Sequence, residues 1–63
     1  MDSDLAELSA LAATLDDLTR RITGIGDRYH GSPRTDVAEG IYEVERSLLT
    51  AARQLERVLR SLG

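Results

Sequence analysis

The sequence predicts an all-α fold, an antiparallel two-helix hairpin of coiled-coil type that dimerises into a four-helix bundle. The first observation is that apolar residues recur at alternating spacings of three and four on both sides of Pro33. They are Leu8, Leu11, Leu15, Leu18, Ile22, Ile25 and Tyr29 before it, and Val37, Ile41, Val44, Leu48, Ala51, Leu55, Val58 and Leu62 after it. The second is that folding at Pro33 aligns seven pairs whose residue numbers sum to 66, from Tyr29 with Val37 to Leu8 with Val58. One register therefore satisfies every layer of the predicted hairpin.

Length and composition predict a single small domain over residues 1–63 that needs outside support. Below about 70–80 residues a lone core rarely supplies more than about 3–5 kcal/mol. The chain has no cysteine, one histidine, and neither phenylalanine nor tryptophan, so disulfides, a structural zinc and large aromatic contacts do not contribute. Self-association is the remaining source of stability.

The first helix is expected over residues of about 4–29. Asp4 has the character of an N-cap, and Glu7 follows at the spacing of a capping box, in which both side chains bind free backbone N–H groups. Two ion pairs with i,i+4 spacing are expected on the outer face, Asp16 with Arg20 and Asp17 with Arg21.

Gly24 and Gly26 are the weak point of this helix, because each glycine costs about 1 kcal/mol against alanine in a helix interior. The apolar spacing nevertheless continues through Ile25 to Tyr29, so we expect the helix to continue as well. Such glycines are typical of close helix approach, and a phosphate-binding loop would need a preceding strand.

The turn is expected over residues 30–35. Gly31 can adopt the left-handed conformation that ends helices, and the residue before Pro33 disfavours helix. The second helix is expected to restart at Thr35 or Asp36, where Asp36 forms another capping-box spacing with Glu39, and to run over about 36–62. A connection this short makes the two helices antiparallel neighbours.

The second helix has a wider apolar arc than one partner helix can cover. The predicted self- or partner-interface therefore lies beside its seam, at Ala38, Tyr42, Leu49, Ala52 and Leu59. A second copy of the hairpin, in contact through this same surface on both chains, is the expected occupant.

Four arginines form a ridge on the outer face of the second helix, at Arg46, Arg53, Arg57 and Arg60. They could contact phosphates or an acidic partner. The competing interpretation is a solvated face whose charge is partly offset by Glu43 and Glu56. The net charge of −3 and the absence of interleaved aromatic residues argue against nucleic-acid binding.

Catalysis and cofactor binding find no support in the residue types. Without Cys or Lys, and with His30 as the only histidine, an activated nucleophile with its base is difficult to assemble. No inward Glu-x-x-His motif of a di-metal bundle is present either. We expect no enzyme activity, no metal and no cofactor.

The resulting hypothesis is a noncatalytic interaction or adaptor module that forms a homodimer. The alternatives are a nucleic-acid-associated regulator using the arginine ridge, and one half of an obligate heteromeric complex such as a toxin-neutralising or secretion-chaperone partner. The acidic N-terminus lacks the features of a signal peptide, and no apolar run suits a membrane span, so a cytoplasmic location is expected. The arginine-only basic residues in an Ala- and Leu-rich background suggest a bacterial source.

Overall fold

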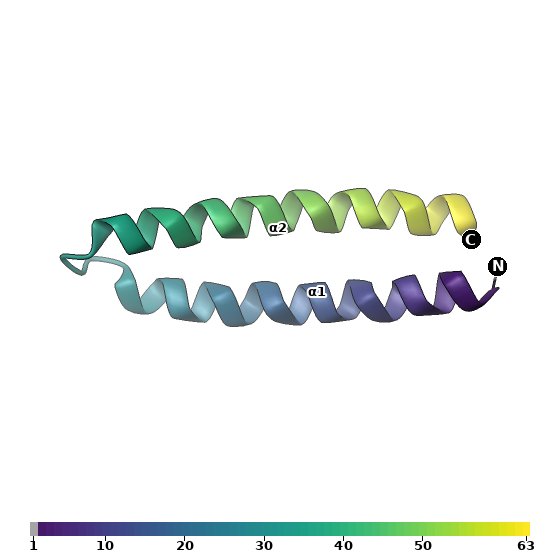
Figure 1. Cartoon of the computed structure of the whole chain (residues 1–63), viewed down its shortest axis with the longest axis horizontal. Coiled ribbons are helices and arrows are strands. Elements are labelled where there is room, and N and C mark those ends of the chain that lie inside the picture. The colour runs from purple at the N-terminus through teal and green to yellow at the C-terminus, as the bar shows by residue number, and fades with distance from the viewer. Residues whose placement is uncertain (1) are drawn as a thin grey trace.

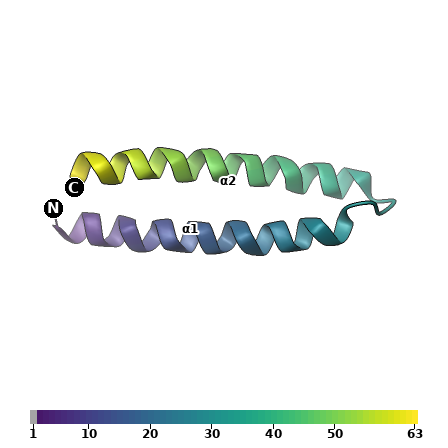
Figure 2. The same ribbon diagram turned by 180° about the vertical axis from the view of Figure 1, so that it is seen from behind.

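The computed structural model describes residues 2–63 as two antiparallel helices that lie side by side (Figures 1 and 2). Helix α1 spans Asp2–Tyr29 and helix α2 spans Thr35–Leu62, with 28 residues in each. The Cα atoms extend over 49 × 15 × 10 Å, so the hairpin is a rod one helix layer thick. The all-helical hairpin predicted from the sequence is confirmed.

Helix α1 differs from the prediction at its start and agrees with it at its end. The helix begins at Asp2, so the N-cap role predicted for Asp4 is wrong, because Asp4 already lies inside the helix. The helix continues through Gly24 and Gly26 to Tyr29, as the apolar spacing predicted. Both expected ion pairs are present, Asp16 with Arg20 at 3.1 Å and Asp17 with Arg21 at 3.7 Å.

A short run of backbone hydrogen bonds closes the turn. The His30 N–H donates to the Gly26 carbonyl at 3.1 Å, and the Ser32 N–H donates to the Tyr29 carbonyl at 3.0 Å. Gly31 has a φ of 79°, the left-handed conformation that glycine adopts without steric cost. The predicted helix-ending role of Gly31 is confirmed.

Helix α2 starts at Thr35, and Arg34 occupies the N-cap position without a side-chain capping bond. The N-cap role predicted for Asp36 is therefore wrong. Asp36 lies in the first turn instead, where it accepts two hydrogen bonds of 3.1 Å from the Arg34 guanidinium. The Ser32 hydroxyl oxygen accepts a hydrogen bond from the Arg34 N–H at 3.1 Å. The turn is therefore supported by the side chain of Ser32, two residues before the N-cap residue Arg34.

The two helices pack through one half-buried stripe on each. On α1 the stripe comprises Leu5, Leu8, Ala12, Leu15, Thr19, Ile22, Gly26 and Tyr29, and Thr23 beside it is also half-buried. On α2 it comprises Ala38, Ile41, Glu45, Leu48, Ala52, Leu55 and Leu59, and Val37 beside it is also half-buried. Both stripes keep the alternating spacing of three and four that the sequence predicted, but they are rotated around the helix axes relative to the predicted seam.

This rotation changes the predicted pairing at Ile25. Ile25 was expected opposite Ile41, yet Ile25 is exposed and Gly26 takes its place: a Cβ atom on Gly26 would lie 2.9 Å from Cγ2 of Ile41. The physical reason is the size of Gly26, which lets Ile41 approach the backbone of α1 more closely than a larger side chain at this position would.

Polar residues inside the contact stripe do not leave buried groups unpaired. The Thr19 hydroxyl donates to the Leu15 carbonyl at 2.8 Å, a bond within the helix itself. Glu45 lies in the stripe beside Gly26 and is only half-buried, so its carboxylate keeps contact with water. Among the described residues no buried side-chain nitrogen or oxygen lacks a hydrogen-bond partner.

The hairpin has no buried core. Of the residues that the structure describes, not one apolar or polar side chain is fully removed from solvent. The Cα radius of gyration is 14.6 Å, against about 11 Å for a globular domain of this length. Within residues 2–63, neither helix is long and apolar enough to cross a membrane.

Alanine substitutions at the two glycines of α1 are expected to have different effects on stability. Gly24→Ala should raise the free energy of unfolding by about 1 kcal/mol, because alanine favours helix and nothing lies within 4 Å of the added methyl group. Gly26→Ala should give less stabilisation or a net loss, because Ile41 must move. Thermal unfolding followed by circular dichroism at one fixed protein concentration compares them, and equal gains would contradict the close contact at Gly26.

The Arg34 guanidinium holds the pKa of the Asp36 carboxyl below its ordinary value, chiefly through their hydrogen bond. A lowered folded-state pKa means that the pair stabilises the start of α2 above the unfolded-state pKa and that this contribution is lost as pH falls through the folded-state pKa. Arg34→Ala should raise the Asp36 pKa towards the ordinary value in a carboxyl NMR titration. Arg57→Ala, at the far end of α2, is the control and should leave it unchanged.

Candidate functional site

Large apolar side chains remain on the surface of this small chain. Eight of them in the described part keep between 41% and 67% of their area exposed. They are Leu11, Leu18, Ile25, Tyr42, Val44, Leu49, Val58 and Leu62. Fully burying an exposed side chain of this size contributes roughly 1.5–3 kcal/mol, and these side chains keep about half of their area available for burial, so together they are the main chemical feature of the surface.

Most of these side chains belong to one broad face of the hairpin. Leu11, Leu18 and Ile25 each directly precede a stripe residue of α1, and Val44, Ala51 and Val58 each directly precede a stripe residue of α2. Two antiparallel helices are related by a two-fold axis perpendicular to the plane that contains both helix axes. This rotation leaves each residue on its own side of the plane, so equivalent positions of α1 and α2 lie on the same side of the hairpin. These six residues therefore form a single surface, called here the apolar face.

The two outer edges of the apolar face differ in character. Along α2 the edge is small and uncharged, with Gly40, Ser47, Gln54 and Ser61 at intervals of seven residues. Along α1 the edge is larger and mostly charged, with Glu7, Thr14, Arg21 and Arg28 at the same interval. Since charged residues are depleted at the centre of protein interfaces, the α2 edge favours close contact with another molecule.

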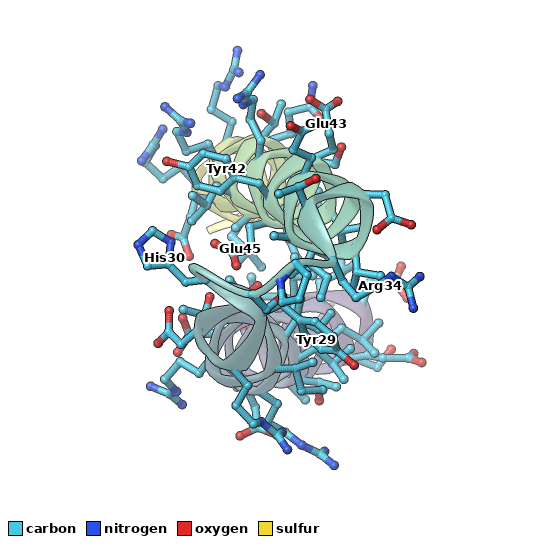
Figure 3. All side chains as sticks on the ribbon, turned by 90° about the vertical axis from the view of Figure 1, so that its left-hand side faces the viewer. Tyr29, His30, Arg34, Tyr42, Glu43 and Glu45 are labelled. Carbon is cyan, nitrogen blue, oxygen red and sulfur yellow. The ribbon has the colours of Figure 1, made fainter. Side chains whose placement is uncertain are left out.

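The opposite side of the hairpin, called here the grooved face, has two open recesses. Near the turn, Gly26 and Ala38 lie in one recess beside Tyr42 and Glu45, and near the termini Ala12 and Ala52 line the other. Figure 3, seen from the turn, shows Tyr42 and His30 on this side, Glu45 between the helices and Arg34 on the other side. The recesses occur where the contact stripe consists of small residues.

The structure divides the five residues predicted for the interface. Ala38, Ala52 and Leu59 are half-buried in the contact stripe between α1 and α2, whereas Tyr42 and Leu49 are exposed beside it on the grooved face. Ala38 and Tyr42 line one recess of the grooved face, and Ala52 and Leu59 line the other, so the interface predicted there stays a prediction. A second exposed apolar surface comes from residues that the sequence assigned to the inside of the hairpin.

Sequence reasoning missed the apolar face because it centred each helix on its largest side chains. A signal for the rotated packing was present in the small residues that recur beside the predicted seam, at Ala12, Gly26, Ala38 and Ala52. Once these small residues face the partner helix, the leucines and valines that precede the stripe residues turn outward.

The arginine ridge lies on the outer side of α2 and is solvent-exposed. The ridge lies on this one helix and consists of Arg46, Arg53, Arg57 and Arg60. Arg46 lies 4.0 Å from the Glu43 carboxylate, and the Arg53 Nε donates to the Leu49 carbonyl at 3.5 Å. These contacts favour a solvated surface in which part of the charge is locally balanced.

The described side chains offer little support for metal chemistry. Across residues 2–63, no group of three or more His, Asp or Glu side chains is placed to hold a metal ion. His30 is exposed at the turn, on the grooved face rather than the apolar face. The geometry thus favours recognition of another surface through apolar contact.

No protein-family model matches this chain, and no curated protein or solved structure matches it either. Arguments about function therefore rest on the hairpin itself, and above all on the apolar face.

The arginine ridge is expected not to bind DNA. It is one helix wide, lacks aromatic neighbours for base stacking and belongs to a chain of net charge −3. Fluorescence anisotropy of a labelled DNA duplex, recorded in about 50 mM and about 200 mM salt, should show no binding in either buffer. Binding that weakens with salt and disappears in Arg53→Ala would instead support the nucleic-acid-associated regulator.

Proposed function

We propose that the chain is a noncatalytic protein–protein interaction module that works as a homodimer, in which two hairpins pack through their apolar faces into a four-helix bundle. The observation that carries this proposal is the combination of a fully formed helical hairpin with no buried side chain among its described residues. A hairpin of this kind gains its core when a second surface covers it.

The exposed area is consistent with one missing partner. The accessible surface is 4939 Å². A compact monomer of 6.9 kDa is expected to expose about 4000 Å², so the hairpin exposes about 900 Å² more than its mass requires. A standard interface removes about 800 Å² from each partner, which is close to this excess.

The charge pattern supports a second copy as the occupant. Each helix begins acidic and ends basic: α1 has no arginine before Arg20 and α2 has none before Arg46, while most of the acidic residues precede these positions. Because the helices are antiparallel, each end of the rod has one acidic and one basic helix half. A second copy supplies the complementary halves, whereas a uniformly charged partner would meet repulsion at half of the surface.

A noncatalytic role is supported by the chemistry of the surface. The apolar face has no titratable side chain among its six residues, and the recesses of the grooved face are open to solvent. Catalysis in water generally needs a sheltered site with an activated group. Binding through apolar area needs neither.

Two matched substitutions test which face forms the dimer. Leu18→Asp places a charge at the centre of the apolar face, and Leu49→Asp places the same charge on the grooved side of α2. A dimer contains two copies of each change, so Leu18→Asp should raise the dissociation constant at least about 100-fold, whereas Leu49→Asp should change it little. Sedimentation equilibrium over a concentration series measures both, with circular dichroism on the same samples.

The wild-type chain should be a helical dimer in this experiment, and Leu18→Asp a monomer of lower helicity. Loss of the dimer in Leu49→Asp alone would place the interface where the sequence analysis predicted it. A wild-type chain that is monomeric and weakly helical at all concentrations would overturn the homodimer and support the alternative of an obligate heteromeric complex.

A further inference from the structure

We infer that the two hairpins of the proposed homodimer stack with both turns at the same end, so that α1 of each copy lies across α2 of the other. This inference rests on the proposed function and adds the orientation of the partner. The evidence is the size of the side chains on the two halves of the apolar face, and the residues along its edges are compatible with it.

Only two symmetric stackings bring the apolar faces together. A two-fold axis along the rod places both turns at one end and α1 over α2 of the second copy. A two-fold axis across the rod places the turns at opposite ends, with α1 over α1 and α2 over α2. In both stackings, the helices that meet are antiparallel and the acidic half of one helix meets the basic half of another. The overall charge pattern therefore does not distinguish the two stackings.

Side-chain size does distinguish the two stackings. The α1 half of the apolar face has the larger residues Leu11, Leu18 and Ile25, and the α2 half has the smaller residues Val44, Ala51 and Val58. Turns at opposite ends would place large residues on large ones along α1 and small residues on small ones along α2. Turns at the same end place a large residue on a small one in every layer, which gives an even thickness and close packing.

The register of this stacking follows from the hairpin itself. A two-fold rotation about the rod axis leaves every position along the rod unchanged, so the two copies cannot slide past each other. Each α1 residue therefore meets the α2 residue of the second copy that has the same position along the rod as its neighbour in the α2 of its own chain. The contact of Gly26 with Ile41 sets that level. Along the rod axis, Leu18 and Ala51 of the second copy then differ in position by about 3 Å, the rise of two helix residues.

The outer edges are compatible with the same register. The layers bring residues of the α1 edge near the outer side of α2 of the second copy. To within one residue, the register makes Glu7 level with Ser61, Thr14 with Gln54, Arg21 with Ser47, and Arg28 with Gly40. None of these pairs joins like charges, so this register meets no electrostatic penalty along the edges.

Single spin labels measure the orientation directly, because the native chain has no cysteine. His30→Cys labels the turn end, and Ser9→Cys labels the same side of α1 nearer the termini; both positions are exposed and lie away from the apolar face. Double electron–electron resonance on each labelled dimer reports the distance between equivalent sites. Sedimentation and circular dichroism on the same samples confirm that each labelled variant is a folded dimer.

Turns at the same end predict similar distances at the two sites, each on the order of 20–30 Å across two helix layers. Turns at opposite ends predict a His30 distance approaching the 49 Å length of the rod and a clearly shorter Ser9 distance, which would overturn the orientation while leaving the homodimer intact. A monomer by sedimentation, with no dipolar signal at either site, would overturn both.

Discussion

Close approach of the two helices at small residues is the constraint on which the rest of this structure depends. Gly26 has room for only a hydrogen atom before Ile41, and the small residues Ala12 and Ala52 are half-buried towards the termini. Packing attraction falls off steeply with distance, so the helices turn their small residues towards each other and gain contact between backbones. The larger side chains then lie on the flanks, where they create the apolar face on one side and border the recesses on the other.

This arrangement couples folding to association. Isolated helices of this kind derive most of their stability from packing of an apolar face, and the pairing of two helices leaves every described side chain partly in water. The proposed dimer would supply the missing burial without any change in the hairpin. Its stability would consequently depend on protein concentration, as it does for proteins whose folded monomer is marginal.

The sequence predicted the hairpin well because helix existence and turn chemistry are local properties. The spacing of apolar residues, the left-handed Gly31 and the i,i+4 ion pairs depend on residues within a few positions of each other, and all were correct. The N-cap roles given to Asp4 and Asp36 were wrong, because an aspartate suits the first turn of a helix as well as it suits the N-cap position. The rotation of the helices was also wrong, since it depends on how closely Gly26 and Ile41 approach across the hairpin.

The start of α1 and the end of α2 lie at the same end of the rod, while the turn projects from the other (Figure 1). A rod 49 Å long with adjacent ends can be inserted into a surface loop of another protein without forcing its insertion points far apart. Such a graft would hold the Gly31 turn away from the host at a fixed reach. Once a partner covers it, the hairpin thus has the geometry of a spacer as well as that of a binding surface.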